Sequence, residues 1–187
     1  MKILAIETSC DETAIALVEA SGGLRSPRFR ILKDVVSSQV KVHQPFGGVV
    51  PSLAKREHIR NLPLVLEKLV NFSSSKIKNK KSKLQLKTQK FLKNIDLIAV
   101  TVGPGLEPAL WTGINFAKDL AKRYKKPLLG VNHLEGHLYS FLLSKARSRK
   151  QEAGNRIYPA IALIVSGGHT ILIHQKNLTT WKKIGET

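Results

Sequence analysis

The chain has 187 residues, which is enough for one domain of ordinary size or one and a fraction. Its hydrophobic content of 42% is typical of a protein that buries a core, yet no apolar run approaches the roughly 20 residues that span a bilayer. The chain starts without a signal-peptide pattern, and its single cysteine, Cys10, excludes an internal disulfide framework. The composition therefore predicts a cytoplasmic protein with no membrane partner.

Charge is the unusual feature of the composition. The chain has 31 Lys and Arg against 13 Asp and Glu, a formal net charge of +18. Such an excess favours a polyanionic partner, and RNA is the first candidate because phosphate contacts dominate that kind of binding. Eight of the lysines fall within residues 71–94, which contain no acidic residue. Because this segment has few apolar residues for packing, we expect a flexible insertion that adds salt-sensitive affinity for RNA, or a basic loop that only keeps the protein soluble.

Apolar runs separated by turn signals predict the elements of the first 70 residues. The expected strands cover residues 1–6, 14–18 and 31–37, and Gly22-Gly23 breaks the chain before the third. A stripe of leucine and isoleucine then predicts a helix over residues 51–70. Pro63 is expected to kink this helix or to mark a new start within it.

Strands and helices alternate after residue 95, which is the pattern of an α/β domain. We expect strands over residues 97–101 and 128–131 and helices over 109–124 and 134–143. After a charged linker, strands over residues 161–165 and 171–174 form a second hairpin around a glycine-rich turn. Two lobes that each open with such a hairpin describe the actin, Hsp70 and sugar-kinase architecture. Residues 1–153 are therefore expected to form lobe one, with the insertion over 71–94, and residues 156–187 to start a second, truncated lobe.

Three turns carry groups that can approach a ligand. Between the first two strands, Glu7, Asp11 and Glu12 accompany small polar residues, so this turn could hold phosphate, a metal or a water, or be an ordinary solvated turn. The turn at residues 103–105 (GPG) precedes an expected helix, whose N-terminus could face a ligand. The turn at residues 166–170 (SGGHT) has two glycines that permit close backbone approach to a nucleotide, although a plain hairpin turn accepts them as well.

His133 and His137 form the sharpest signal in the sequence. Because they lie four residues apart, both would face one side of a helix, as two imidazole ligands of one metal do. A structural or incidental pair has the same spacing. The segment is not the zinc-protease motif, since Leu134 stands where that motif needs Glu. Surface or packing roles are expected for the lone histidines His43, His58 and His174.

Five segments together resemble the TsaD family of tRNA N6-adenosine threonylcarbamoyltransferases, once called glycoproteases. They follow the family's order and approximate spacing: IETSCDET at 6–13, GGVVPSLAKREHIR at 47–60, VGPGL at 102–106, VNHLEGHL at 131–138 and LIVSGGHT at 163–170. The resemblance implies an actin-like ASKHA (ribonuclease H-like) fold, here the first lobe plus the first hairpin of the second. It also implies transfer of a threonylcarbamoyl group from threonylcarbamoyl-AMP to N6 of the adenosine beside the anticodon in tRNAs that read ANN codons.

The same resemblance implies roles for individual residues. His133 and His137 would bind the active-site metal, iron or zinc, which activates carbamoyl or phosphate oxygens as a Lewis acid. The partners would be tRNA and TsaB-like and TsaE-like proteins. The adenylate site would be lined by Ile164, Val165, Ser166, Gly167 and Gly168, with His169 close by and Glu12 as a polar catalytic residue.

The chain departs from the family pattern at three places. Ser52 stands where Glu is usual, Glu107-Pro108 replaces a small or apolar pair, and the chain ends before the family's later Asp ligand to the metal. We therefore expect a fragment, a separately encoded half or a degenerate copy. Two other functions are left open. One is a non-catalytic TsaB-like binding module, against which the intact histidine pair argues; the other is the older peptidase assignment, for which the sequence has neither an HExxH motif nor a recognisable Ser or Cys triad.

Overall fold

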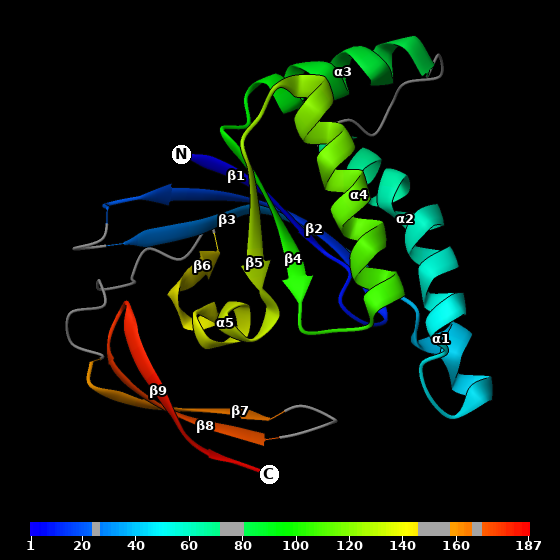
Figure 1. The fold of residues 1–187 in the computed structure, drawn as a ribbon. Coiled ribbons are helices and arrows are strands. Elements are labelled where there is room, and N and C mark those ends of the chain that lie inside the picture. Colours follow the sequence, from blue (N-terminus) through cyan, green and yellow to red (C-terminus); the bar gives the residue numbers. More distant parts are fainter. Residues whose placement is uncertain (24–26, 72–80, 146–157, 166–169) are drawn as a thin grey trace.

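The computed structural model describes residues 1–23, 27–71, 81–145, 158–165 and 170–187 as two β-sheets with helices packed on them (Figure 1). The larger sheet has the strand order β5-β4-β1-β2-β3-β6. Its strands are β1 (Lys2–Glu7), β2 (Glu12–Ser21), β3 (Arg28–Ser38), β4 (Leu97–Gly103), β5 (Leu128–Asn132) and β6 (Leu143–Lys145). The first three strands pair antiparallel in sequence order, whereas β4 and β5 run parallel to β1. The strands expected up to residue 131 are thus confirmed, and β6, parallel to β3, is an addition.

Helices α2 (Pro51–Asn71) and α4 (Glu107–Tyr124) cover one face of the larger sheet (Figure 1). A short helix α1 (Val40–His43) and a 3-10 turn η1 (Gln44–Phe46) lead from β3 into α2. Helix α2 continues as one element across Pro63, so the proline does not divide it. Among the described helices, none is both long and apolar enough to cross a membrane. Sheet and helices bury a common cluster that includes Leu4, Ile6, Ile15, Leu17, Leu62, Val65, Leu66, Leu69, Ala117, Leu120 and Ala121.

Helix α4 packs tightly on the end of β1 at Gly113. A Cβ added to this glycine would lie 2.3 Å from the hydroxyl oxygen of Thr8, which donates a hydrogen bond to the Ala109 carbonyl at 3.0 Å. Because Thr8 is fully buried, Gly113→Ala is expected to cost about 1–3 kcal/mol of unfolding free energy from overpacking, partly offset by the better helix propensity of alanine. Urea denaturation measures the difference. Gly136→Ala is the matched control, since a Cβ there meets nothing within 4 Å, and equal stability of the two variants would refute the tight contact.

The lysine-rich segment contains a helix, α3 (Lys81–Lys93), against expectation. Leu92 and Ile95 are buried in the main core and Phe91 packs against it, so the prediction that this segment cannot pack was wrong near residue 91. The reason is that lysine, leucine and glutamine are good helix formers, and a few apolar anchors at one end suffice to dock such a helix. Residues 72–80 lie outside the described residues, so the expected flexibility is untested there.

The helix expected over residues 134–143 is shorter than predicted. Helix α5 spans His133–Leu138, a 3-10 turn η2 covers Ser140–Leu142, and the chain then enters β6. The prediction failed because the chain pairs with β3 from Leu143 onward, and this partner is distant in sequence and not revealed by local periodicity.

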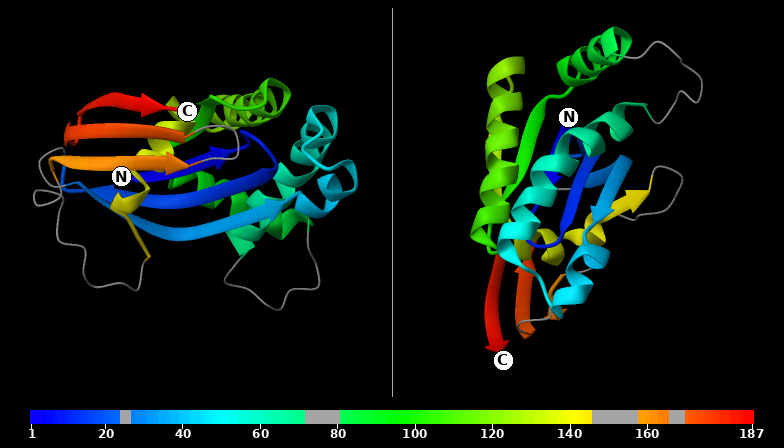
Figure 2. Two further views of the ribbon diagram at one scale, coloured as in Figure 1. Left: turned by 90° about the horizontal axis from the view of Figure 1, so that it is seen from below. Right: turned by 90° about the vertical axis from the view of Figure 1, so that its right-hand side faces the viewer.

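The second sheet consists of β7 (Ala160–Val165), β8 (Thr170–Asn177) and β9 (Thr180–Glu186), of which the sequence predicts only the first two. Neighbouring strands pair antiparallel. One face packs on α5, where Leu138, Ile171 and Ile173 are buried together. Figures 1 and 2 show this sheet beyond α5, at the end of the molecule opposite α3. The lobe boundary expected near residues 153–156 falls outside the described residues and stays a prediction.

Candidate functional site

The candidate site lies where three parallel strands end. Strands β1, β4 and β5 are neighbours in the larger sheet, so their C-terminal ends meet at one edge. That edge is where ligands bind in many open α/β sheets. Glu7 is the last residue of β1, Thr101 lies near the end of β4, and His133 begins α5 directly after β5. Residues far apart in sequence are therefore brought together by strand order.

His133 and His137 turn their rings toward each other across one turn of α5. The two Nε2 atoms are 3.1 Å apart and the ring centroids are 4.5 Å apart. The start of the helix is fixed by Asn132, whose side-chain oxygen accepts hydrogen bonds from the backbone N–H of Leu134 and Glu135 at 2.8 and 3.1 Å. The pair thus shares one helix face, as its spacing predicts.

Glu7 lies behind His133. Its carboxylate is 3.4 Å from Nδ1 of His133, and the Ser9 hydroxyl is 3.3 Å from the same nitrogen. Because a carboxylate only accepts hydrogen bonds, Nδ1 carries the proton, and Nε2 of the neutral ring keeps its lone pair for the space beside His137. The Glu7 carboxylate also accepts hydrogen bonds from the Thr101 hydroxyl and the Ser9 backbone N–H.

These hydrogen bonds determine the charge of Glu7. Burial alone raises the pKa of this carboxyl group, but hydrogen bonds from Ser9 and Thr101, together with His133, outweigh burial and hold the pKa below its ordinary value. Glu7 is therefore ionised at neutral pH and places a negative charge behind the imidazole. The sequence predicts Glu7 only as a turn residue and does not single out Thr101. Both are polar residues at the ends of predicted parallel strands, and this position is the signal that could have identified them.

The two imidazoles fit a divalent metal ion. Two nitrogens bound to one ion at about 2.1 Å lie roughly 3.0–3.4 Å apart for angles of about 90–109°. The Nε2–Nε2 separation of 3.1 Å falls in this range. The carboxylate behind His133 is the partner that metal-ligating histidines usually have. Within the described ranges, no group of three or more His, Cys, Asp and Glu side chains could hold an ion, so this chain offers two ligands where a catalytic zinc usually has three.

The turn between β1 and β2 contributes Ser9 to this centre, whereas Glu12 is exposed as the first residue of β2. A second turn, between β4 and α4, holds the first in place: the Leu106 N–H donates to the Ser9 carbonyl at 2.8 Å. A Cβ on Gly105 would lie 2.6 Å from that same carbonyl oxygen, so glycine is needed where the two turns meet. The GPG turn therefore supports the site through close backbone contact.

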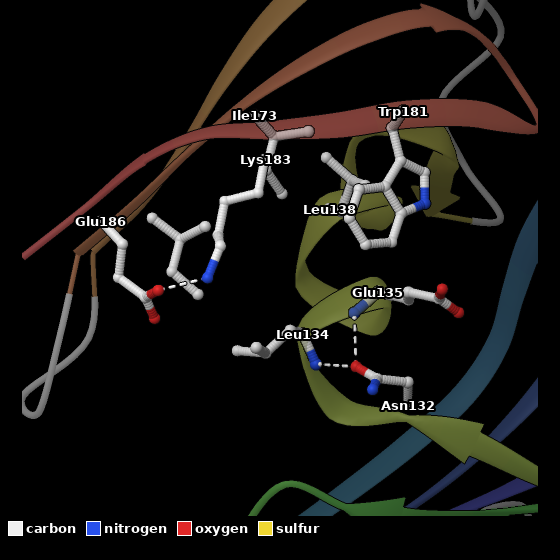
Figure 3. Close-up of a pocket in the computed structure, with 9 residues that line it drawn as sticks. Asn132, Leu134, Glu135, Leu138, Ile173, Trp181, Lys183 and Glu186 are labelled. Atoms are coloured by element: carbon white, nitrogen blue, oxygen red, sulfur yellow. Dashed lines mark hydrogen bonds and ion pairs between the residues drawn. The ribbon is translucent and has the colours of Figure 1, made fainter.

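A cavity of about 290 Å³ lies between α5 and the second sheet (Figure 3). Figure 3 shows the Trp181 ring pointing from β9 toward α5, and Lys183 paired with Glu186 at the rim. The cavity adjoins the histidine pair, because Leu134 and Glu135 line it, but neither histidine is part of its wall. The lining residues are Asn132, Leu134, Glu135, Leu138, Ile171, Ile173, Trp181, Lys183 and Glu186.

The residues expected at the adenylate site are described only in part. Ile164 packs against the Leu138 cluster under α5, whereas Val165 is 71% exposed on the opposite face of β7. Ser166, Gly167, Gly168 and His169 lie outside the described residues. Their roles stay predictions.

A known protein family shares the sequence that builds this geometry. Residues 30–187 match the family described as tRNA N6-adenosine threonylcarbamoyltransferase, TsaD. The chain belongs to the TsaD family. TsaD-family relatives from Synechococcus sp. (strain JA-3-3Ab) and Bacillus subtilis (strain 168), both described as tRNA N6-adenosine threonylcarbamoyltransferase, are 43% and 40% identical over 187 residues. Each match covers 100% of this chain and 45% of the relative, so the chain spans about half the length of these TsaD proteins.

A solved structure bears on the fold of this TsaD chain. YeaZ from Pseudomonas aeruginosa superimposes with a TM-score of 0.51, covering 100% of this chain and 65% of that chain at 16% identity. Identity this low informs on the fold alone. The expected actin-like ASKHA (ribonuclease H-like) fold of the first lobe is confirmed by this likeness and by the strand order.

Proposed function

We propose that this chain takes part in the transfer of a threonylcarbamoyl group from threonylcarbamoyl-AMP to N6 of the adenosine beside the anticodon in tRNAs that read ANN codons. Its contribution is the two histidine ligands of the metal centre. The observation that carries the proposal is the His133–His137 pair, with Nε2 atoms 3.1 Å apart and the Glu7 carboxylate behind it. A module that only binds a partner would need neither feature. Family membership supports the substrates, and tRNA modification of this kind would take place in the cytoplasm.

His133 and His137 would hold the metal, iron or zinc, through their Nε2 atoms, with further ligands from outside this chain. When bound, a divalent ion at this place supplies Lewis-acid polarisation of a carbonyl or phosphate oxygen. Glu7 retains the Nδ1 proton of His133 and thereby orients the ring. Ser9 and Thr101 hold Glu7 in turn, so the pair is preorganised by hydrogen bonds that the chain itself provides.

The transfer requires an acceptor for one proton. The N6 amine of adenosine attacks the carbamoyl carbonyl carbon, a C–N bond forms, the bond from that carbon to the phosphate oxygen breaks, and AMP leaves. Glu12 is proposed to take the proton that the amine releases, with His169 close to the adenylate. The adenylate would be bound along Ile164, Val165, Ser166, Gly167 and Gly168. The decisive assay is formation of threonylcarbamoyladenosine in tRNA by this chain together with the portion of a relative that lies beyond the match.

A second candidate function is a non-catalytic module that pairs with another subunit through the helices of lobe one. It is favoured by a hollow of about 570 Å³ between α2 and α4, beside which Ile59 is 56% and Trp111 50% exposed. TsaB-like and TsaE-like proteins are the proposed partners in either case. His133→Ala separates the two functions, because a transferase component would lose activity with this variant whereas a binding module would still support its partner.

The tRNA partner predicts salt-dependent binding through the lysine-rich segment. Because α3 is anchored in the core, deleting residues 71–94 would disturb the fold, so lysines at 76, 78, 80, 90 and 93 are changed to glutamine instead. For every phosphate that the variant no longer neutralises, the slope of log affinity against log salt should become shallower by about 0.7–0.9. Lys176→Gln and Lys182→Gln, exposed on the second sheet, are the control. Unchanged affinity at low salt would leave the segment as a solubilising element.

A further inference from the structure

Two buried histidines form a hydrogen-bonded chain that the proposed chemistry does not use. His58 in α2 is 0% exposed and His43 in α1 is 4% exposed, while His174 is exposed on β8. His43 and His58 thus lie in the packed interior and His174 at the surface, as expected. Gln39 lies between the two buried rings, and Thr13 of β2 contacts His58 from the other side. These four side chains link β2 and the segment that follows β3 to α2.

Backbone groups at both ends determine where the protons of this chain lie. At one end, the Val50 N–H donates to Nδ1 of His43 at 3.3 Å, so the proton of that ring is on Nε2. At the other end, Nε2 of His58 lies 3.0 Å from the Cys10 carbonyl. A carbonyl only accepts, so Nε2 of His58 also carries the ring proton. Both rings therefore carry a proton on Nε2.

The middle of the chain agrees with this assignment. Nε2–H of His43 donates to Oε1 of Gln39 at 3.0 Å, which leaves the Gln39 amide NH₂ to face the His58 ring, 3.3 Å from Nδ1 and 3.4 Å from Nε2. Nδ1 of His58 accepts from the Thr13 hydroxyl at 2.8 Å. A second proton on His58 would have to sit on Nδ1, where the Gln39 NH₂ is a donor and the Thr13 hydroxyl would have to turn its own proton away to accept. Because the ring is fully buried, the site favours the neutral ring over the imidazolium.

We propose that His58 is a positioning residue for the β1–β2 turn, holding it through the Cys10 carbonyl, and that protonation of the ring, which the buried site disfavours, shifts the turn toward an open state. Only the link of this turn to catalysis rests on the proposed function. The turn is bound from two further sides: the Gln39 N–H donates to the Asp11 carbonyl at 2.9 Å, and the Leu106 N–H donates to the Ser9 carbonyl at 2.8 Å. Since Ser9 faces His133, loss of the His58 bond would loosen the hydroxyl beside the metal-binding ring.

The surroundings of His58 both raise and lower the pKa of its ring. Burial lowers the pKa of His58, and His43 lowers it further, whereas the Cys10 carbonyl and the carboxylates of Glu7 and Asp11 raise it; the net effect is a pKa below the ordinary value. With the turn open, the ring would return to an ordinary pKa of about 6.5. The open state then binds more protons than the closed state, so the closed turn is stable above about pH 6.5 and weakens as the pH falls below it.

Amide hydrogen exchange measures this opening directly in the 187-residue chain, without RNA or adenylate. The reporters are the amides of Gln39 and Leu106, and the amide of Ile98, which donates to the Pro127 carbonyl at the other end of β4, is the internal reference. Below about pH 6.5, the opening equilibrium at the reporters, corrected for intrinsic exchange, should rise by up to about tenfold per pH unit. At about pH 7.5, His58→Ala should raise it by about tenfold, the effect of one buried hydrogen bond.

Substitutions distinguish positioning from general stability. His58→Gln can donate to the Cys10 carbonyl and accept from Thr13, so it should restore protection at about pH 7.5 while removing the pH dependence. His174→Ala, an exposed histidine on β8, should leave both unchanged. The proposal would be overturned if opening in the parent chain did not depend on pH, a measurement that needs no variant to fold. It would also be overturned if His58→Gln and His58→Ala opened equally. Absence of transferase activity would leave these exchange results intact, so failure of the proposed function is distinguishable.

Discussion

The 187-residue chain alone is expected to transfer no threonylcarbamoyl group to tRNA above the uncatalysed background. The first reason lies in the proposed metal centre. His133 and His137 are two ligands, the described residues hold no group of three, and a catalytic metal usually keeps three protein ligands and one open position. The second reason is the proposed adenylate site: the chain spans about 45% of the length of its relatives, and loss of substrate positioning alone removes orders of magnitude in rate. Mass spectrometry of tRNA nucleosides, after incubation with threonylcarbamoyl-AMP, measures the product.

Addition of the part of a relative that this chain does not cover should give transfer. The portion of the Bacillus subtilis relative beyond its match to this chain, purified separately, supplies it. Product should form only when both pieces are present, and neither should suffice alone. Robust turnover by the 187-residue chain by itself would show that the active site is elsewhere. Failure of the mixture, with both pieces folded, would favour the binding-module function.

Replacement of either His133 or His137 by alanine is expected to weaken the binding of Zn²⁺ or Co²⁺ by more than about 100-fold. Even the loss of a residue that only hydrogen-bonds to a metal ligand lowers metal affinity by roughly 10–100-fold. The reason is geometric: each ring supplies one of the two Nε2 atoms that lie 3.1 Å apart. The Co²⁺ absorption spectrum and chelator competition give the affinity. Binding should also weaken as the pH falls, because the ligands must be neutral.

Two further variants test the arrangement around this pair. Glu7→Gln keeps the shape of the side chain but removes the charge behind His133, so the metal affinity should fall by about 10–100-fold. His174→Ala removes an exposed imidazole on the second sheet and should change nothing. If His174→Ala weakened binding as much as His137→Ala, the metal would be bound by surface histidines in general rather than by the pair on α5.

Local patterns predicted most of the first lobe, and the errors have one physical cause. Strands β1 to β5 and helices α2 and α4 were expected because alternation and helical stripes are properties of short segments. The helix α3, the short length of α5 and the strands β6 and β9 were not expected. In each case the segment is held by contacts with partners that local periodicity does not reveal, such as the docking of Leu92 in the core or the pairing of β6 with β3.

The histidine pair and the family are predictable from the sequence alone, because a spacing of four residues and five ordered motifs are local features of the sequence. The groups that face this pair are known only from the folded chain. Glu7 and His133 are 126 residues apart, and they meet because β1 and β5 flank β4 and all three strands end at one edge. The same holds for His58 and the Cys10 carbonyl, 48 residues apart, which are joined by the packing of α2 beside β2. Strand order and helix packing bring together residues that are distant in sequence, and no local pattern encodes either.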